Sequence, residues 1–325
     1  MSALSDSSRA LLLFVVVLVS SCAIRPPAEQ PMVIHPDAHS GGSSVGFSHS
    51  GTLLASGGWE GVIQLWQLPG GEPVVRWQAH GDSVNGVAFS DDDRQVVSAG
   101  YDGELVAWTL GGEAVRRVVT PSPVMHMVAD AELDRVVTGH RDGSVRIWRF
   151  TDFTLLDERH LYRDSVKAVA IDHGTRRYAS SSADGRVHVW DENATAVELQ
   201  GPPADAWALA FSPDGKRLFG GTWFRLLRWD LGDHTLTTLP TEHHGIIRSV
   251  QFTANGDELA TISRQTDSSV YFLDPETAEV TRRFQQHDLC GAAITASPDG
   301  RYLATTSDDA SVRIWNLEIE DKPSR

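Results

Sequence analysis

A tryptophan recurs at nearly constant spacing along this chain and constrains its fold more than any other feature. The recurring positions are Trp66, Trp108, Trp148, Trp190, Trp229 and Trp315, with Leu273 in the one gap, and successive positions are 39 to 44 residues apart. Each of them closes a short run of alternating apolar residues, which is the pattern of a β-strand with one buried face. A period near 40 residues with several short strands in each unit predicts a β-propeller.

The second repeat shows the strands of one unit most clearly. Strand patterns occupy residues 83–90, 94–100, 104–110 and 114–120. Turn sequences rich in Asp, Asn and Gly separate the first and second strands of most repeats, and Asp-Gly pairs separate the second and third strands in several. These residues tolerate the positive φ angles of tight hairpins. We therefore expect each repeat to form a blade of four antiparallel strands.

The runs at residues 136–148, 178–191 and 303–316 resemble the WD40 repeat family. The resemblance covers residues 32–317 and implies an all-β fold, a seven-bladed WD40-type propeller. The last repeat has only three strand patterns, whereas residues 32–35 supply a spare one before the first repeat. Since an unpaired edge strand invites aggregation, we expect this N-terminal strand to complete the last blade and close the ring.

The N-terminus resembles a bacterial lipoprotein signal peptide. Residues 10–19 are apolar, and Val19-Ser20-Ser21 precede Cys22, which suits cleavage and lipid attachment at that cysteine. An uncleaved short membrane anchor is the alternative. The predicted organisation is a signal peptide at residues 1–21, a lipidated tether at 22–31, the propeller at 32–317 and a charged tail at 318–325.

The predicted compartment follows from the residue after the lipidation site. Ala23 stands there, where an Asp would favour retention in the inner membrane. The resemblance therefore implies the cell envelope and, in a Gram-negative source, the outer membrane facing the periplasm. The tether should enter the propeller from the face that carries the turns between first and second strands, which we call the bottom face. The top face carries the turns between second and third strands and the loops that lead into the first strands.

Charge limits the partners. The chain has 43 acidic and 28 basic residues, a net charge of −15. Nucleic acid and anionic lipid surfaces are poor partners for such a protein, so membrane attachment should depend on the lipid at Cys22. Cys290 is the one other cysteine, which leaves no intramolecular disulfide after lipidation. We expect a monomer that binds another envelope protein.

Several repeats carry the same set of His, Ser or Thr, Asp and Trp. The sets in repeats two and seven are His80, Ser98, Asp102 and Trp108, and His287, Thr305, Asp309 and Trp315. The WD40 resemblance implies that each set is a hydrogen-bonded tetrad within one blade. A Ser, a His and an Asp are also the components of a catalytic triad. Recurrence in several repeats favours the structural role, and we predict that the protein is not an enzyme.

Repeat five departs from the others. It lacks the His, Ser and Asp, and its shortened turn between second and third strands contains Trp223, Phe224 and Arg225. Aromatic and Arg side chains are common anchors of protein interfaces. A decayed repeat whose aromatic residues cap the blade is the alternative. The predicted partner-binding residues of the top face are Trp59, Tyr101, Arg141, Tyr162, Trp223, Phe224, Arg225 and His244.

No motif in the chain indicates a cofactor. The histidines are dispersed, Asp91-Asp92-Asp93 lacks the spacing of a calcium loop, and no glycine-rich phosphate loop occurs. We therefore predict no metal and no cofactor. The sequence favours a protein-binding scaffold or adaptor. The alternatives are a small-molecule binder or enzyme that uses the mouth of the central channel, and, by analogy of architecture alone, an accessory factor in outer-membrane protein assembly.

Overall fold

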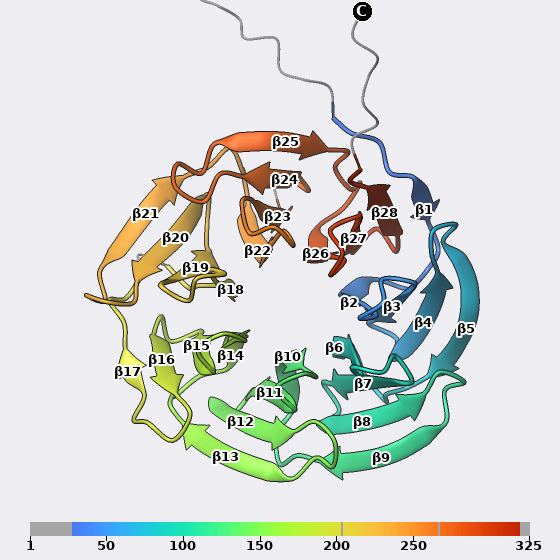
Figure 1. Ribbon diagram of the computed structural model, residues 1–325, viewed down its shortest axis with the longest axis horizontal. Coiled ribbons are helices and arrows are strands. Elements are labelled where there is room, and N and C mark those ends of the chain that lie inside the picture. Colours follow the sequence, from blue (N-terminus) through green and yellow to red (C-terminus); the bar gives the residue numbers. More distant parts are fainter. Residues whose placement is uncertain (1–27, 203, 266, 319–325) are drawn as a thin grey trace, which may run out of the picture.

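Seven four-stranded antiparallel sheets form a closed ring in the computed structural model, which describes residues 28–318 apart from 203 and 266. Figure 1 looks down the axis of this ring and shows the sheets as blades around a central channel. The described residues contain strands and turns but no helix. The predicted fold class, an all-β seven-bladed propeller, is confirmed.

The first four blades follow the tryptophan period. Blade one contains β2 (Gly42–Phe47), β3 (Leu53–Gly58), β4 (Val62–Gln67) and β5 (Glu72–Gln78). Blade two contains β6 (Val84–Phe89), β7 (Gln95–Gly100), β8 (Glu104–Thr109) and β9 (Ala114–Val119). Blade three contains β10 (Val124–Asp130), β11 (Arg135–His140), β12 (Ser144–Arg149) and β13 (Leu155–His160). Blade four contains β14 (Val166–Asp172), β15 (Arg177–Ser182), β16 (Val187–Asp191) and β17 (Val197–Glu198).

The remaining blades complete the ring, and the last one includes the first strand of the chain. Blade five contains β18 (Ala208–Phe211), β19 (Arg217–Gly221), β20 (Arg225–Asp230) and β21 (Leu236–Pro240). Blade six contains β22 (Ile246–Phe252), β23 (Leu259–Arg264), β24 (Val270–Leu273) and β25 (Val280–Phe284). Blade seven contains β26 (Gly291–Ala296), β27 (Tyr302–Ser307), β28 (Val312–Asn316) and β1 (Val33–His35).

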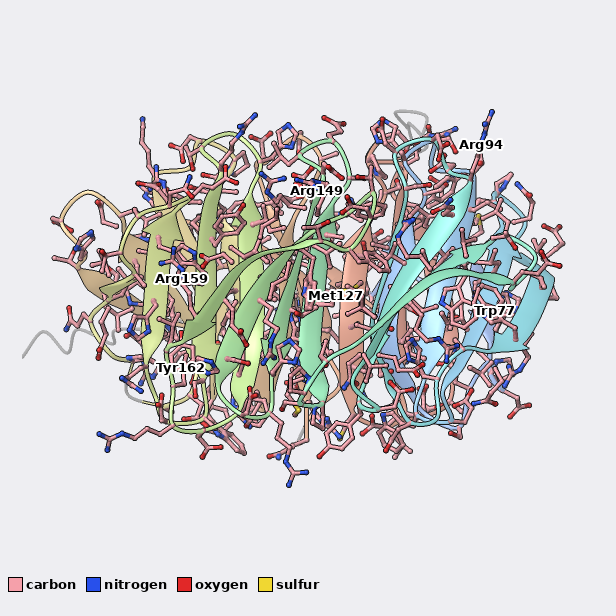
Figure 2. The ribbon with its side chains drawn as sticks, turned by 90° about the horizontal axis from the view of Figure 1, so that it is seen from below. Trp77, Arg94, Met127, Arg149, Arg159 and Tyr162 are labelled. Atoms are coloured by element: carbon pink, nitrogen blue, oxygen red, sulfur yellow. The ribbon has the colours of Figure 1, made fainter. Side chains whose placement is uncertain are left out.

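The two faces of the disc carry different connections. The first strand of each blade lines the channel and the fourth lies at the outer rim (Figure 1). In the side view of Figure 2, Arg94 and Arg149 lie near one edge of the disc. Arg94 belongs to a turn between first and second strands, so this edge is the bottom face. Tyr162, in the loop that leads into β14, lies near the opposite edge, which is the top face.

The core lies between the blades. One cluster joins Ala55, Ile63 and Leu65 of blade one to Val84, Val96 and Trp108 of blade two, and similar clusters recur around the ring. The blades approach closely: a Cβ added at Gly139 would lie 2.3 Å from a methyl carbon of Val166 in the next blade. Interiors packed this tightly leave no room for a side chain there. Each blade therefore supports the next by burial of apolar surface.

The N-terminal strand closes the ring as predicted. β1 pairs antiparallel with β28, with Val33 opposite Ile314 and His35 opposite Val312. The N–H of Met32 adds a hydrogen bond of 2.7 Å to the carbonyl of Ile314. Segments nearly 280 residues apart in the sequence thus share one sheet, which leaves no free edge on β28.

The segment before β1 differs from the expected route through the bottom face. Glu29 forms a parallel bridge with Phe284, which ends β25 on the top side of the rim. The backbone N–H of Glu29 donates to Arg283 O at 2.8 Å. The carboxylate of Glu29 accepts two hydrogen bonds from Arg282, of 2.8 and 2.7 Å. The described chain therefore approaches the ring across the outer rim of blade six. The predicted signal peptide, Cys22 and most of the charged tail lie outside the described residues.

Ring closure predicts a large difference between two truncations. Deletion of residues 28–36 removes the β1 pairing and the contacts of Glu29, and we expect it to lower the free energy of unfolding by at least about 3 kcal/mol, since each backbone hydrogen bond contributes roughly 1 kcal/mol. Deletion of residues 319–325 removes none of the described contacts and serves as the control. Urea denaturation of both variants measures the difference, and equal midpoints would contradict the closure model.

Candidate functional site

The tetrad of blade two forms a continuous buried hydrogen-bond chain. The indole N–H of Trp108 donates to Ser98 Oγ at 2.8 Å, and the hydroxyl of Ser98 lies 2.7 Å from His80 Nε2. His80 Nδ1 is 3.1 Å from Asp102, whose carboxylate also accepts the N–H of Gly81. Because a carboxylate only accepts, Nδ1 carries the proton and Nε2 accepts from the serine. Every polar group of the set has a partner.

Blades one and seven contain variants of the same chain. In blade one Glu60 replaces the aspartate, and its carboxylate is 2.8 Å from His39 Nδ1. Burial alone would raise the pKa of Glu60, but the hydrogen bonds from His39 and Ser40 lower it to about 2. In blade seven His287 contacts both Thr305, at 2.7 Å, and Asp309, at 3.0 Å.

One member of the predicted tetrad in blade seven has a different partner. The indole N–H of Trp315 donates to the carbonyl of Glu29 at 3.3 Å, not to Thr305. The extended segment before β1 supplies this carbonyl, and nothing in the local repeat pattern shows its position. Trp315 therefore joins the closure of the ring rather than the tetrad.

Blade three forms a similar hydrogen-bond network, but its histidine lies on the second strand and not in the loop. Thr120 stands where blades one, two, six and seven have the loop histidine, and His140, at the end of β11, takes its role. His140 Nδ1 donates to Ser122 O at 3.0 Å, and its Nε2 is 2.8 Å from the hydroxyl of Thr138, which also accepts from Trp148. Blade two has Gly100 at the position of His140, and a Cβ there would lie 2.6 Å from His80. Blade two therefore has room for the loop histidine and not for a side chain at position 100 in its present arrangement.

Blade four uses a tyrosine, and this corrects one predicted binding residue. Tyr162 is only 7% exposed, and its hydroxyl is 2.7 Å from Ser180 Oγ. Burial raises the pKa of Tyr162 beyond its usual range. The side chain fills the space of the loop histidine instead of facing solvent. Tyr162 is therefore a core residue and not part of an exposed partner surface.

The tetrads do not form a nucleophilic site. Ser98 has no solvent exposure, and its hydroxyl already serves Trp108 and His80. A substrate carbonyl could reach the oxygen only if the blade opened. The tetrads are interior hydrogen-bond networks that hold the second and third strands to the loops of the top face.

The remaining predicted residues lie in the turns of the top face and form two separate groups. Arg141 of blade three donates to the hydroxyl of Tyr101 of blade two at 2.9 Å, and its guanidinium lies over that ring. Trp59, in the neighbouring turn of blade one, is 45% exposed. His244 is exposed beside Asp267 in blade six.

Blade five carries the second group. Trp223 and Phe224 are 37% and 47% exposed, with ring centroids 5.5 Å apart, and Arg225 is also exposed. Phe224 has a φ of 60°, a left-handed conformation that is costly for a bulky side chain. Its N–H donates to Gly245 O at 3.0 Å and its carbonyl accepts from Thr241, so neighbouring loops hold the backbone in this state. Strain of this kind concentrates at functional sites.

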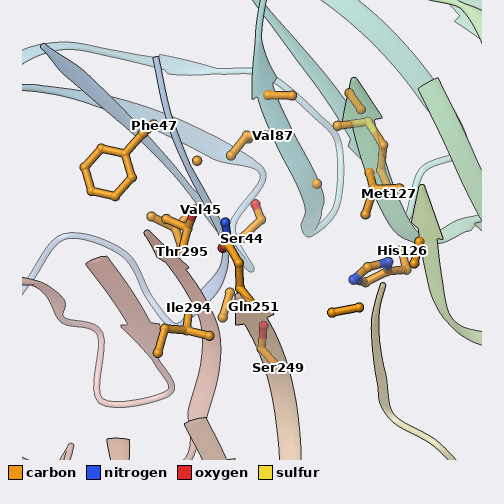
Figure 3. A pocket seen from close by; sticks show the side chains of 18 of the residues that line it. Ser44, Val45, Phe47, Val87, His126, Met127, Ser249, Gln251, Ile294 and Thr295 are labelled. Carbon is orange, nitrogen blue, oxygen red and sulfur yellow. The ribbon is translucent and has the colours of Figure 1, made fainter. Parts of the chain in front are cut away.

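The central channel is a second candidate site. It encloses about 810 Å³ and is lined by the inner strands of all seven blades. In the close view of Figure 3, Ser44, His126, Met127, Ser249 and Gln251 surround a common space. Burial, and then the charge of Arg248, lower the pKa of His126 to about 3. The channel is therefore lined by neutral polar and apolar groups beside a few charges.

The bottom mouth of the channel holds a group that the sequence spacing did not indicate. The ligand atoms of His49, Asp91 and Glu132 lie within 4.8 Å of one another, although the three residues come from the turns of three blades. His173 adds a contact of 2.8 Å to Asp130. His49, Asp91 and Glu132 are all exposed, and His49 forms ion pairs with the two carboxylates only when its ring is protonated.

Comparison with known proteins identifies the repeats. The sequence model of the family described as "WD domain, G-beta repeat" matches residues 32–67, 71–109, 154–191 and 278–316. The chain is 23% identical over 280 residues to Striatin-4 of Homo sapiens, covering 76% of this chain and 37% of that protein. It is 24% identical over 288 residues to Autophagy-related protein 16 of Arabidopsis thaliana, covering 86% of this chain and 48% of that protein. It is 27% identical over 329 residues to WD repeat-containing protein 90 of Homo sapiens, covering 88% of this chain and 19% of that protein. The chain thus spans less than half the length of these relatives.

The network of blade three predicts a pH dependence of stability. Burial, and then the charge of Arg146, lower the pKa of His140 to about 4. The unfolded chain binds the proton first, so stability is fully present above about pH 6.5 and is lost as the pH falls toward 4, by about 1.4 kcal/mol per pH unit for one histidine. His140→Gln should reduce the slope of unfolding free energy against pH, between pH 6.5 and 4, by about 1.4 kcal/mol per pH unit. This change in slope is expected however much the substitution lowers the free energy of unfolding at neutral pH. An unchanged slope in urea titrations would contradict the assignment.

Proposed function

Because the chain is a seven-bladed WD40-type propeller, we propose that it acts as a non-enzymatic adaptor in the bacterial cell envelope and binds another envelope protein through its top face. WD40 propellers generally act as scaffolds for protein partners. The observation that carries the proposal is the exposed pair Trp223 and Phe224 on blade five. The alternative, aromatic residues that cap a decayed blade, calls for burial, whereas both rings are more than one third exposed.

The top face offers a mixed surface of the kind that protein interfaces use. Tyr101 and Arg141 form a hydrogen-bonded cation–π pair. Trp59 of blade one adds an exposed ring to Trp223 and Phe224. Trp, Tyr and Arg are the residue types enriched at binding hot spots. Leu289, which is 56% exposed in the loop before β26, extends the apolar surface toward blade seven. These residues are separated by polar turns, which suits an extended partner that contacts several blades.

Membrane attachment is part of the same proposal. Residues 10–22 have the pattern of a lipoprotein signal, and in the described residues no helix has the length and apolar character to span a bilayer. Cys22 precedes Glu29 by seven residues, and Glu29 lies on the outer rim. A tether of this length reaches roughly 20 Å if extended. We infer that the rim of blades six and seven lies nearest the membrane, which leaves the top face accessible from the side.

The top-face proposal predicts a site-specific crosslinking pattern. Photocrosslinking probes placed singly at Trp59, Tyr101 and Trp223 should give a discrete protein adduct in the native envelope, whereas probes at Asp92 and Asp214 on the bottom face should not. In the protein with the probe at Tyr101, Trp223→Ala with Phe224→Ala should reduce the adduct at least about tenfold, the scale of losing one hot spot.

A matched control comes from the outer rim of the same molecule. Val115 and Val119 are 50% and 70% exposed on β9, so the double change Val115→Ala with Val119→Ala removes exposed apolar surface away from the top face. This control should leave the adduct unchanged. Equal loss in both double variants, or adducts from the bottom probes alone, would contradict the assignment of the top face.

The anchor predicts a separate result. Cys22→Ser removes the site of lipidation, and the protein should then move from the membrane fraction to the soluble fraction, since the net charge of −15 disfavours binding to anionic lipid. Fractionation with immunoblotting measures the change, and mass spectrometry of the wild-type N-terminus tests for the lipid. Sedimentation with membranes despite the change, once the signal is cleaved, would indicate a protein receptor instead of a lipid anchor.

A further inference from the structure

In the inner strand of each blade, the side chain at one position points in a different direction from those of its neighbours. In six blades the pairing between the first and second strands shifts by one residue at this position, which is a β-bulge. A bulge re-aims a side chain and is common beside functional sites. The residues at this position in the seven blades, with blade five placed by sequence spacing, are Ser43, Asn85, Met125, Lys167, Trp207, Arg248 and Ala292.

Two of these bulge residues, Ser43 and Asn85, donate hydrogen bonds within the ring, whereas the indole N–H of Trp207 is buried without a partner. Ser43 donates to Val84 O at 2.5 Å, and Asn85 donates to Val124 O at 2.7 Å, in each case in the following blade. The ammonium of Lys167 lies 4.1 Å from the centre of the Trp207 ring. The bulge position thus links neighbouring blades near the top of the channel.

Arg248 differs from Ser43 and Asn85 in the number of donors that it leaves unmet. Its side chain lines the channel, and its one hydrogen bond is a long one, 3.4 Å, to Trp207 O. It forms no ion pair within 4.0 Å with a carboxylate of the described residues. A guanidinium has five N–H donors, so most of the hydrogen-bonding capacity of Arg248 is left to whatever occupies the channel.

The charges around Arg248 do not neutralise it. Arg264 and Asp308 lie nearby at the top of the channel and pair with each other at 3.1 Å. Burial, and then the charge of Arg264, lower the pKa of Arg248 to about 10, so it keeps its charge at neutral pH. The group of Arg248, Arg264 and Asp308 therefore has one net positive charge, inside a protein whose total charge is −15. An uncompensated charge in a confined space is costly unless a counter-charge binds.

His126 offers another donor to the channel, from the inner strand of blade three. Its Nδ1 accepts the N–H of Val169 at 3.3 Å, so the neutral ring carries its proton on Nε2. Figure 3 shows the ring of His126 at the wall of the channel, across from Ser249 and Gln251. A planar guanidinium suits the two oxygens of a carboxylate, which accept paired hydrogen bonds in one plane.

We propose that the upper part of the channel binds a carboxylate group, held by the guanidinium of Arg248. The carboxylate comes either from a small organic acid or from an acidic side chain that a protein partner inserts from the top face. The channel volume of about 810 Å³ accommodates both sources. This site goes beyond the adaptor role and does not require Trp223 or Phe224.

The test is calorimetric titration of the full-length chain in detergent with four probes. Acetate is the small acid and acetamide its uncharged counterpart. The capped peptides Ac-Gly-Glu-Gly-NH2 and Ac-Gly-Gln-Gly-NH2 present the same comparison on a peptide. We expect at least one of the two carboxylate probes to bind more tightly than its amide counterpart. Arg248→Gln should weaken that binding by at least about tenfold, the effect of losing a charge-assisted bidentate contact.

Two controls separate the site from general charge and from folding. Arg163→Gln removes an exposed cation of the top face outside the channel and should change affinity by less than about twofold. Arg248→Lys keeps the charge and should retain part of the affinity. The thermal midpoint of each variant without ligand reports on folding.

In wild type, carboxylate bound in the channel should also raise the NMR-measured pKa of His126, because a nearby negative charge favours the protonated form of the ring.

The binding results distinguish the two sources of the carboxylate. Binding of acetate alone, lost in Arg248→Gln, assigns the site to a free organic acid, and binding of the glutamate peptide assigns it to an inserted acidic side chain. Amide probes that bind as well as the carboxylates, or affinities unchanged in Arg248→Gln, overturn the proposal. A top-face adduct in the crosslinking experiment is independent of these results, so the two proposals can fail separately.

Discussion

The pairing of β1 with β28 is the constraint on which the ring depends. A propeller blade buries its two faces against its neighbours, so an open ring would expose the faces and the edge of its terminal blades. The three residue pairs from Val33 opposite Ile314 to His35 opposite Val312 remove that edge. Glu29 reinforces the closure by adding to β25 and by accepting the indole N–H of Trp315. The shape of the channel and the arrangement of the top-face turns follow from a closed ring.

A second constraint is the buried polar chemistry within each blade. A hydroxyl on the second strand and an indole N–H on the third must find partners, because an unsatisfied buried donor costs about 1 to 3 kcal/mol. Blades one and two meet this requirement with a loop histidine and an acid, blade three with His140, and blade four pairs its serine with Tyr162. In blade seven Trp315 uses a backbone carbonyl instead. The indole N–H of Trp190 in blade four is the one of these groups that stays without a partner in the described residues. Different residues thus meet most of the same requirement, and the fold is kept although the repeats differ in sequence.

Function concentrates where these constraints are absent. The turns of the top face are free to vary once the tetrads hold the loops, and blade five, which lacks a tetrad, exposes Trp223 and Phe224 on a strained turn. The bulge position on each inner strand is likewise free to carry any side chain that the channel can hold. Arg248 is placed there with most of its donors unmet, in contrast to Ser43 and Asn85. The blades thus carry both proposed sites, the top face for a protein partner and the channel wall for a carboxylate.

The sequence by itself determined the blade number, the four strands of each blade, the closing strand and the tetrad of blade two. These are local properties, because strand period and turn residues are repeated within each unit of about 40 residues. Only the tertiary structure decided that Tyr162 is buried, that His140 replaces a loop histidine and that Trp315 bonds to Glu29. It also decided that Arg248 forms no ion pair with the described part of the chain. Each of these depends on which atoms meet in space, across neighbouring blades or across the closure. A repeat pattern specifies where a strand runs but not which partner its side chains find.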